Sequence, residues 1–133
     1  MMVQLINHSA DKSAQIVETF DDVAAALQEG PPEQPVLWSP VNAASIHGVL
    51  WFAELQRLAT AAFPKVKPII ALDCGDRADL AHAAMCEGLR VICFQGEPAM
   101  LAKLQNIAEK LGTRIETAHP VQDCERERTR RGD

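Results

Sequence analysis

The segment KPIIALDCGDRADLAHAAMCEGLRVICFQG, residues 67–96, decides the fold class of this chain. Residues 68–72 and 90–94 are apolar runs without polar alternation, which is typical of strands covered on both faces. The alanine-rich stretch between them predicts a helix, and a helical connection makes the two strands parallel. The segment is therefore a complete strand–helix–strand unit.

The same alternation extends to both sides of this segment. Further strands are predicted at residues 14–20, 35–38 and 114–118, and helices at residues 23–28, 41–63 and 98–111. Right-handed crossovers turn this pattern into a three-layer α/β/α sandwich with a mostly parallel five-stranded sheet. We expect the flavodoxin-like strand order 2-1-3-4-5, with a Rossmann-like order as the second choice.

The ends of the chain are less regular than its middle. The first strand is predicted at residues 14–20, with residues 2–6 as the alternative, so residues 1–13 are an N-terminal strand or turn. Residues 121–133 are charged and have too few apolar side chains to pack, which predicts a disordered tail. A single domain over residues 1–120 is expected.

Composition excludes several classes of protein. The net charge is −5 and no stripe of basic residues occurs in the folded region, which argues against nucleic acid as a partner. No apolar stretch approaches the roughly 20 residues needed to cross a bilayer, so no membrane association is expected. The four cysteines form no C-x-x-C pair and no zinc-type spacing with histidine, which favours a reducing, cytoplasmic setting.

The helix predicted at residues 41–63 carries more apolar surface than one buried stripe requires. Its large side chains include Trp51 and Phe52. A second apolar face on a helix that packs on a sheet suggests a partner, and a homodimer through this helix is the expectation. The same side chains are also consistent with ordinary core packing.

Polar residues follow the predicted strands, at the sheet edge where open parallel sheets bind ligands. The candidate ligand-binding residues are Ser39, Asn42, Asp73, Cys74, Gly75, Asp76, Arg77 and Gly96. A small anionic metabolite at residues 75–77 is the expected ligand. No glycine-rich nucleotide fingerprint supports a more specific ligand.

Several of these residues have simpler roles. Asp76 is expected to cap the following helix, and Gly75 to form a tight turn. A helix N-terminus would lower the pKa of the Cys74 thiol, whereas the adjacent acids would raise it. Ser39, His119 and Asp73 are a nominal Ser-His-Asp set, but Ser39 is not in a G-x-S-x-G elbow, so no triad is expected.

Three acids give a second interpretation. In the expected strand order, Asp21 and Asp22 would face Asp73, and three carboxylates favour a hard cation such as magnesium. This arrangement resembles a response-regulator receiver domain, in which an acidic pair and a third-strand aspartate bind magnesium and the aspartate accepts a phosphoryl group. The resemblance implies those roles for Asp21, Asp22 and Asp73. The Ser or Thr and the Lys that the family places after its fourth and fifth strands are missing, since Phe94-Gln95 and His119-Pro120 stand there.

The sequence thus favours a non-enzymatic cytoplasmic module that binds a ligand or a protein partner, since no complete catalytic constellation is present. A receiver-like, magnesium- or phosphoryl-dependent domain is the alternative.

Overall fold

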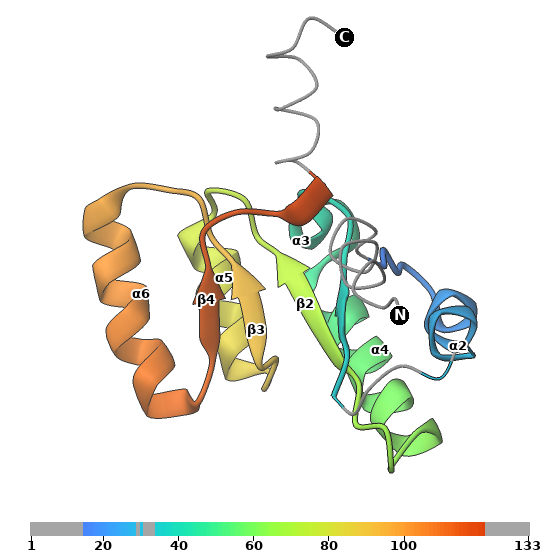
Figure 1. Ribbon diagram of the computed structural model, residues 1–133. Coiled ribbons are helices and arrows are strands. Elements are labelled where there is room, and N and C mark those ends of the chain that lie inside the picture. Colours follow the sequence, from blue (N-terminus) through green and yellow to red (C-terminus); the bar gives the residue numbers. More distant parts are fainter. Residues whose placement is uncertain (1–14, 29, 31–33, 122–133) are drawn as a thin grey trace, which may run out of the picture.

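The computed structural model describes residues 15–28, 30 and 34–121 (Figure 1). This part of the chain is an α/β sandwich with a parallel sheet, which confirms the predicted class. Its elements are α2 (Phe20–Leu27), β1 (Val36–Trp38), α3 (Ala43–His47), α4 (Val49–Ala62), β2 (Ile69–Asp73), α5 (Ala78–Cys86), β3 (Val91–Cys93), α6 (Pro98–Leu111) and β4 (Arg114–Glu116). The predictions for residues 1–13 and 122–133 lie outside the described residues, whereas Val121 is helical.

The sheet differs from the expectation in the number and order of its strands. Within the described residues it has four strands in the order β1-β2-β3-β4, so the predicted five strands in the order 2-1-3-4-5 are wrong. β1 pairs directly with β2, with Trp38 opposite Ala71. Each step along the chain moves one strand further across the sheet, so the described strands contain no point where their order reverses. The crevice that such a reversal opens for ligands is therefore missing here.

From residue 15 on, where the structure describes it, the segment predicted as the first strand forms one bridge to the sheet. Ile16 pairs with Trp38 in parallel, on the edge of β1 opposite to β2. The chain then turns into α2, because Thr19 and Asp22 form a capping box in which each side chain accepts a hydrogen bond from the other's backbone N–H. Two satisfied N–H groups outweigh the strand propensity of residues 14–20, and the helix begins at Phe20 rather than at residue 23.

The long helix expected at residues 41–63 is broken in two. Gly48, with φ 95° and ψ 151°, ends α3 and precedes α4. This backbone geometry is outside the helical region and is accessible to glycine at little cost. At 14 residues each, α4 and α6 are too short to cross a bilayer, and none of the other helices in the described ranges is long and apolar enough to do so.

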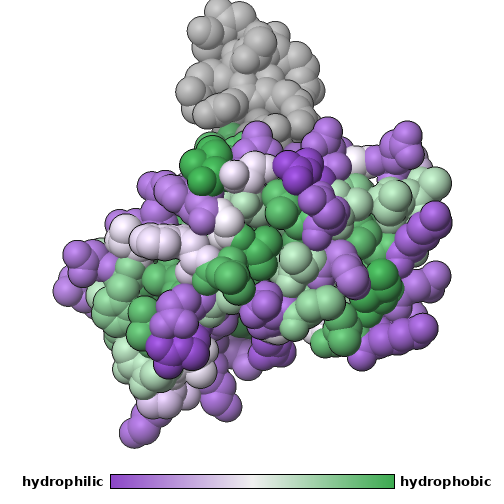
Figure 2. Space-filling view, turned by 180° about the vertical axis from the view of Figure 1, so that it is seen from behind, coloured by the Kyte–Doolittle hydropathy of each residue, from purple (hydrophilic) through white to green (hydrophobic). Residues whose placement is uncertain are grey.

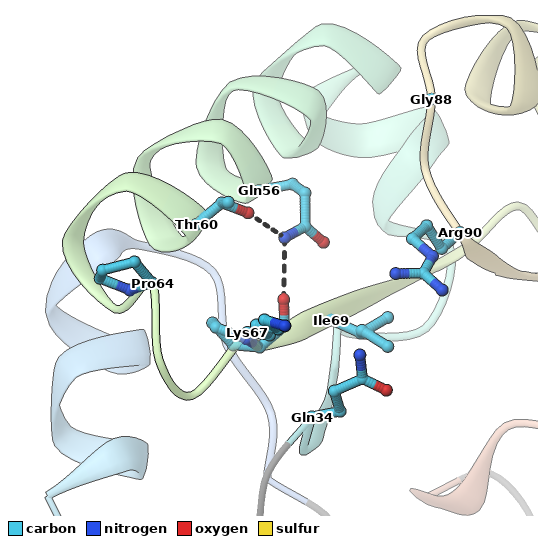
Figure 3. Close-up of a pocket in the computed structure, with 9 residues that line it drawn as sticks. Gln34, Gln56, Thr60, Pro64, Lys67, Ile69, Gly88 and Arg90 are labelled. Carbon is cyan, nitrogen blue, oxygen red and sulfur yellow. Dashed lines mark hydrogen bonds between the residues drawn. The ribbon is translucent and has the colours of Figure 1, made fainter.

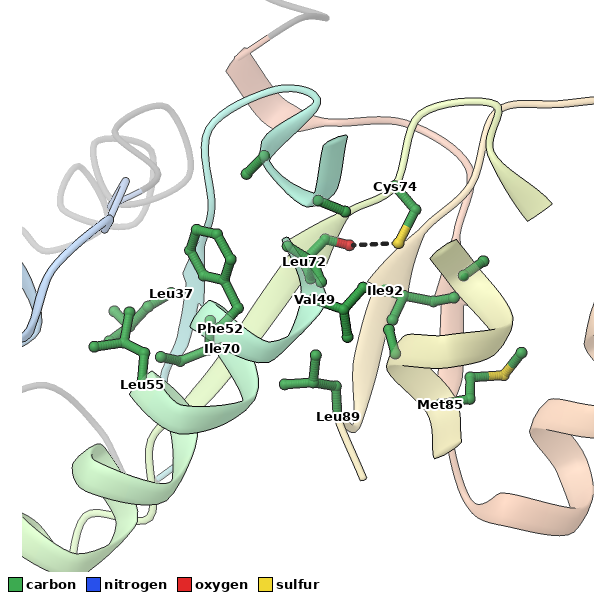
Figure 4. Packing of buried hydrophobic residues seen from close by; sticks show 14 of the residues in the cluster. Leu37, Val49, Phe52, Leu55, Ile70, Leu72, Cys74, Met85, Leu89 and Ile92 are labelled. Carbon is green, nitrogen blue, oxygen red and sulfur yellow. Dashed lines mark hydrogen bonds between the residues drawn. The ribbon is translucent and has the colours of Figure 1, made fainter. Parts of the chain in front are cut away.

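The hydrophobic core lies between the sheet and helices α4 and α5 (Figure 4). Phe52 and Leu55 of α4 pack toward Ile70 and Leu72 of β2, and Ile92 of β3 continues the layer. Neighbouring helices also pack on one another in the series α2, α4, α5 and α6. The apolar runs that predicted strands therefore supply the core, as a parallel sheet requires.

Candidate functional site

The loops after β1 and β2 lie side by side because these two parallel strands are direct neighbours. The Ser39 hydroxyl accepts a hydrogen bond from the backbone N–H of Asp73 at 2.9 Å and donates to the Pro40 carbonyl at 3.0 Å. The backbone N–H of Asn42 donates to Oδ2 of Asp73 at 2.6 Å. Three of the predicted site residues thus form one hydrogen-bonded group, although they come from two separate loops.

Gly75 completes this group, which we call the carboxyl-edge cluster: Ser39, Asn42, Asp73 and Gly75. Gly75 has φ 58°, in the left-handed region that favours glycine. A Cβ at this position would overlap Oδ1 of Asn42. The Gly75 carbonyl accepts a hydrogen bond from the backbone N–H of Gln95 at 2.7 Å. The turn is therefore packed closed, and it offers no open cradle for an anion.

Asp73 carries the least satisfied polar atom of the cluster. Its side chain is fully buried, and Oδ1 has no hydrogen-bond partner in the described structure. The buried Cys93 thiol is the donor within reach of this carboxylate: burial, and secondly the hydrogen-bonding interaction with the Asp73 side chain, raise the pKa of Cys93. Burial of an acceptor without a partner costs free energy of folding, so Asp73 is the member of the cluster that loop anchoring explains least completely.

The side chain of Cys74 belongs to the hydrophobic core (Figure 4). Its side chain is 1% exposed, and Sγ lies 3.9 Å from the Leu72 carbonyl oxygen. Burial, with smaller contributions from the charges of Asp73 and Asp79, raises the pKa of Cys74 to about 12. The acids and the burial thus outweigh the helix dipole. The thiol stays protonated at neutral pH, which removes it as a nucleophile.

Asp76 and Arg77 are exposed next to the cluster. The Arg77 guanidinium binds the Asp79 carboxylate through two contacts, Nε to Oδ1 at 3.0 Å and Nη2 to Oδ2 at 2.8 Å. These hydrogen bonds raise the pKa of Arg77 and lower that of Asp79. The predicted cap is wrong, because the N-cap position of α5 is Arg77 and not Asp76. An anion at residues 75–77 would have to compete with Asp79 for the arginine.

Gly96, the last candidate of this edge, is explained by packing. A Cβ there would overlap the ring of Phe94, the residue that follows β3. The close approach of backbone and ring requires glycine whether or not a ligand binds.

Ser39, His119 and Asp73 do come together, but not as a catalytic triad. Nε2 of His119 lies 2.7 Å from the main-chain carbonyl oxygen of Ser39, and Nδ1 accepts from the backbone N–H of Val121 at 3.1 Å. The histidine therefore carries its proton on Nε2, and both ring nitrogens are engaged with main-chain groups and not with the serine hydroxyl. All three residues are 0% exposed. The hydrogen bonds of these three residues hold loops together, and none of them activates a nucleophile.

Asp21 and Asp22 lie on α2 and do not face Asp73. The expected adjacency is wrong because β1 lies between β2 and the segment that leads into α2. Asp22 already accepts from the backbone N–H groups of Glu18 and Thr19 at 2.8 and 3.1 Å. Within residues 15–28, 30 and 34–121, no three His, Cys, Asp or Glu side chains are grouped to hold a metal ion. The magnesium site that the receiver resemblance implies is not formed by these three acids.

A different surface has the features of a binding site. We call it the α3–α4 face; it consists of Ile46, Leu50, Trp51, Glu54, Arg57 and Leu58. The side chains of Ile46, Leu50, Trp51 and Leu58 are 68%, 68%, 49% and 38% exposed. Phe52, expected beside Trp51 at this surface, is instead fully buried. Figure 2 views the molecule from behind and shows hydrophobic side chains reaching the surface between hydrophilic ones.

Trp51 is held in a defined position on this face. Its indole Nε1 donates to the Glu18 carbonyl at 2.7 Å, and its ring stacks on His47 at 5.9 Å between centroids. Nε2 of His47 in turn lies 3.0 Å from Oε2 of Glu18. A half-exposed tryptophan whose polar group is satisfied presents a rigid apolar surface.

A cavity at the other edge of the sheet had no signal in the sequence. Gln34, Lys67 and Arg90 line it. They precede three different strands, and no motif connects residues that only strand pairing brings together.

No protein-family model matches this chain, and no curated protein or solved structure shows significant similarity to it.

Proposed function

We propose that this chain is a non-enzymatic interaction module that forms a homodimer through the α3–α4 face. The observation that carries the proposal is the exposure of Ile46, Leu50, Trp51 and Leu58 on adjoining helices. Monomeric proteins rarely expose large apolar side chains in a contiguous group, and such groups mark interaction sites. Tryptophan and leucine side chains of this kind lose water on association and supply its free energy.

The pattern along α4 suits a helix that packs on both sides. Leu50, Glu54 and Leu58 follow one another at intervals of four residues, which places them on one face of the helix. Phe52 and Leu55 lie on the inner side and are buried. The outer side is therefore apolar at both ends and charged at its centre.

A second copy of the chain is the partner that this arrangement fits. Glu54 and Arg57 form an ion pair within the helix, and both side chains remain more than half exposed, at 56% and 64%. If two copies of α4 pack antiparallel about a two-fold axis near Glu54, Leu50 of one protomer meets Leu58 of its partner. Glu54 of one protomer then meets Glu54 of its partner near the axis, and Arg57, about one turn along each helix, lies beside these carboxylates, so the two arginines offset the charge of the two glutamates.

The α3–α4 face also contains a hollow that suits such packing. A hollow of about 160 Å³ is lined by Trp51, Glu54, Leu55 and Leu58. Leu50 of the opposite protomer is the residue that the two-fold arrangement brings to this hollow. An anchor side chain in a pocket is a common centre of a stable interface.

The carboxyl-edge cluster supports this assignment indirectly. Its hydroxyl and backbone groups are bonded to one another, and the nearby Arg77 is paired with Asp79. Loop anchoring accounts for these contacts without a ligand. The interaction surface is therefore the better explanation of what the domain presents to other molecules.

Sedimentation velocity of purified protein tests the proposal. We expect a dimer at about 100 μM, with a concentration-dependent shift toward monomer on dilution. Leu50→Glu places a charge in the interface and is expected to give a monomer with unchanged circular dichroism. The matched control is Leu111→Glu, because Leu111 is also exposed, at 50%, but lies at the end of α6; this variant stays dimeric.

Charge reversal tests the orientation. Glu54→Arg and Arg57→Glu are each expected to weaken the dimer through like charges, and the double variant to restore it. A monomeric wild-type protein at this concentration, or equal effects of Leu50→Glu and Leu111→Glu, would overturn the proposal.

A further inference from the structure

The cavity at the amino-terminal edge of the sheet lies where α4 ends and β2 and β3 begin (Figure 3). Its volume is about 420 Å³, within the range of about 300–1,000 Å³ that is typical of small-molecule sites. Gln34, Gln56, Thr60, Lys67, Ile69 and Arg90 are among the residues that line it. We propose that this cavity binds a small organic anion, a carboxylate or phosphate with a compact apolar body.

Arg90 differs from the other arginines that the structure describes. Arg57, Arg77 and Arg114 each form an ion pair with a carboxylate two or three residues away in the sequence. Arg90 forms no ion pair with any residue in the described ranges, and its guanidinium extends toward Ile69 in Figure 3. A guanidinium at the wall of a cavity, with its donors available, is suited to carboxylate and phosphate.

The second cation, Lys67, is presented by an unusual backbone conformation. Lys67 has φ 55° and Gln34 has φ 60°, both in the left-handed region that favours glycine. The two segments are joined by a hydrogen bond from the backbone N–H of Gln34 to the Val66 carbonyl at 2.7 Å. A residue other than glycine strains the backbone at such a position, which suggests that the side chains of Lys67 and Gln34 are themselves needed. Backbone strain of this kind is concentrated at functional sites, including ligand-binding sites.

Thr60 adds a third donor to the cavity. Both amide protons of Gln56 are already used, since Nε2 donates to the Pro68 carbonyl at 2.9 Å and to Oγ1 of Thr60 at 3.0 Å, and Oε1 accepts from the backbone N–H of Ile70 at 2.8 Å. Since Oγ1 of Thr60 accepts from Gln56, its own proton is directed elsewhere. Thr60, Lys67 and Arg90 therefore offer hydrogen-bond donors, which an anion matches.

The turn after α4 is closed by its own hydrogen bonds. The carbonyl of Phe63, the residue that follows α4, accepts from the backbone N–H groups of Val66 and Lys67, at 3.2 and 3.0 Å. The end of the helix is thereby joined to the segment that carries Lys67. Pro64, Pro68 and Ile69 add apolar wall beside the donors, which accounts for the expected apolar body of the ligand.

Titrations followed by amide NMR test the site with defined probes: inorganic phosphate, benzoate, and benzamide as the uncharged isostere of benzoate. We expect saturable shifts of the backbone amides of Lys67, Ile69 and Arg90 with phosphate or benzoate and none with benzamide. Binding of phosphate alone would assign a phosphorylated ligand, and binding of benzoate alone a carboxylate.

Substitutions test whether the probe binds in the cavity. Arg90→Gln and Lys67→Gln should each weaken binding about tenfold or more, the loss of one charge-assisted contact. Lys103→Gln removes an exposed charge on α6 and should leave it unchanged. Leu50→Glu should also leave it unchanged, so the site is separable from the dimer. Two results would overturn the proposal. One is the absence of any saturable shift up to about 10 mM probe, because a Kd above this concentration is weaker than metabolite sites have. The other is binding that both cavity variants retain.

Discussion

The backbone N–H of Asn42 donates to the carboxylate of Asp73 across 2.6 Å, and this bond joins the loop after β1 to the end of β2. Asn42 itself has φ 61°, in the left-handed region, and directly precedes α3. The buried carboxylate thus holds the turn from which α3 starts. Loss of this contact is expected to affect the whole carboxyl edge of the sheet.

Asp73→Ala should therefore lower the free energy of unfolding by about 2–3 kcal/mol, because it removes a charge-assisted hydrogen bond and leaves the Asn42 N–H unpaired. Asp73→Asn keeps an acceptor for that N–H and should cost less than Asp73→Ala. Urea unfolding measures both, with Asp76→Ala as the exposed neighbour control. An equal loss for Asn and Ala would mean that the negative charge, not the acceptor, is what the site requires.

Gly75→Ala is expected to destabilise the protein more than a left-handed backbone alone explains. Gly112 is the matched control, since it has φ 76° at the end of α6 and no atom near its missing Cβ. Gly112→Ala should cost about 1 kcal/mol, the strain of the backbone. Gly75→Ala adds an overlap with the Asn42 side chain, so Asn42→Ala should recover part of its loss in a double-mutant cycle. Additive effects of the two substitutions would contradict this contact.

The buried thiols predict instability at alkaline pH. Burial raises the pKa of Cys74 from 9.0 to about 12, and that of Cys93 also rises. Below pH 9 both thiols are protonated in the folded and the unfolded chain, so their contribution to stability is complete. Above it the unfolded chain releases protons that the folded chain retains, and the free energy of unfolding falls by about 1.4 kcal/mol per pH unit for each thiol.

Urea unfolding between about pH 8 and pH 11 measures this slope, and the absence of tyrosine from the chain removes one competing titration. Cys74→Ala should reduce the slope by about half, since one of two thiols is gone. Cys86→Ala changes an exposed thiol and should leave the slope as it is. A slope that Cys74→Ala does not alter would show that this thiol is not the cause.

His119 should behave as a structural residue. Its ring donates to the Ser39 carbonyl and packs edge-on against Trp38, at 5.0 Å between ring centroids. His119→Leu fills a similar volume but leaves that buried carbonyl unpaired, which should cost about 1–3 kcal/mol. His119→Gln places an amide donor near the position of Nε2 and should recover part of the loss. His82→Leu, at an exposed position, is the control, and an equal effect there would contradict this role.

Local signals in the sequence predicted most of the regular elements. The apolar runs around residues 68–72 and 90–94 are β2 and β3, and the amphipathic stretch at residues 98–111 is α6, with Gly112 after it. These predictions succeed because apolar periodicity, a proline at the helix start and a glycine at its end act within a few residues. The start of α2 is also encoded locally, by the Thr19 and Asp22 pair, and this capping box prevails over the strand propensity of residues 14–20.

By itself, then, the sequence determined an α/β chain with parallel strands, and it drew attention to Ser39, Asn42, Asp73 and Gly75. Only the tertiary structure decided the strand order, because pairing depends on contacts between segments far apart in the chain. The order β1-β2-β3-β4 removes the crevice that was expected at the carboxyl edge and separates Asp21 and Asp22 from Asp73. It also decided which polar groups satisfy one another and which face outward, because burial is a property of the packed molecule and not of any short segment.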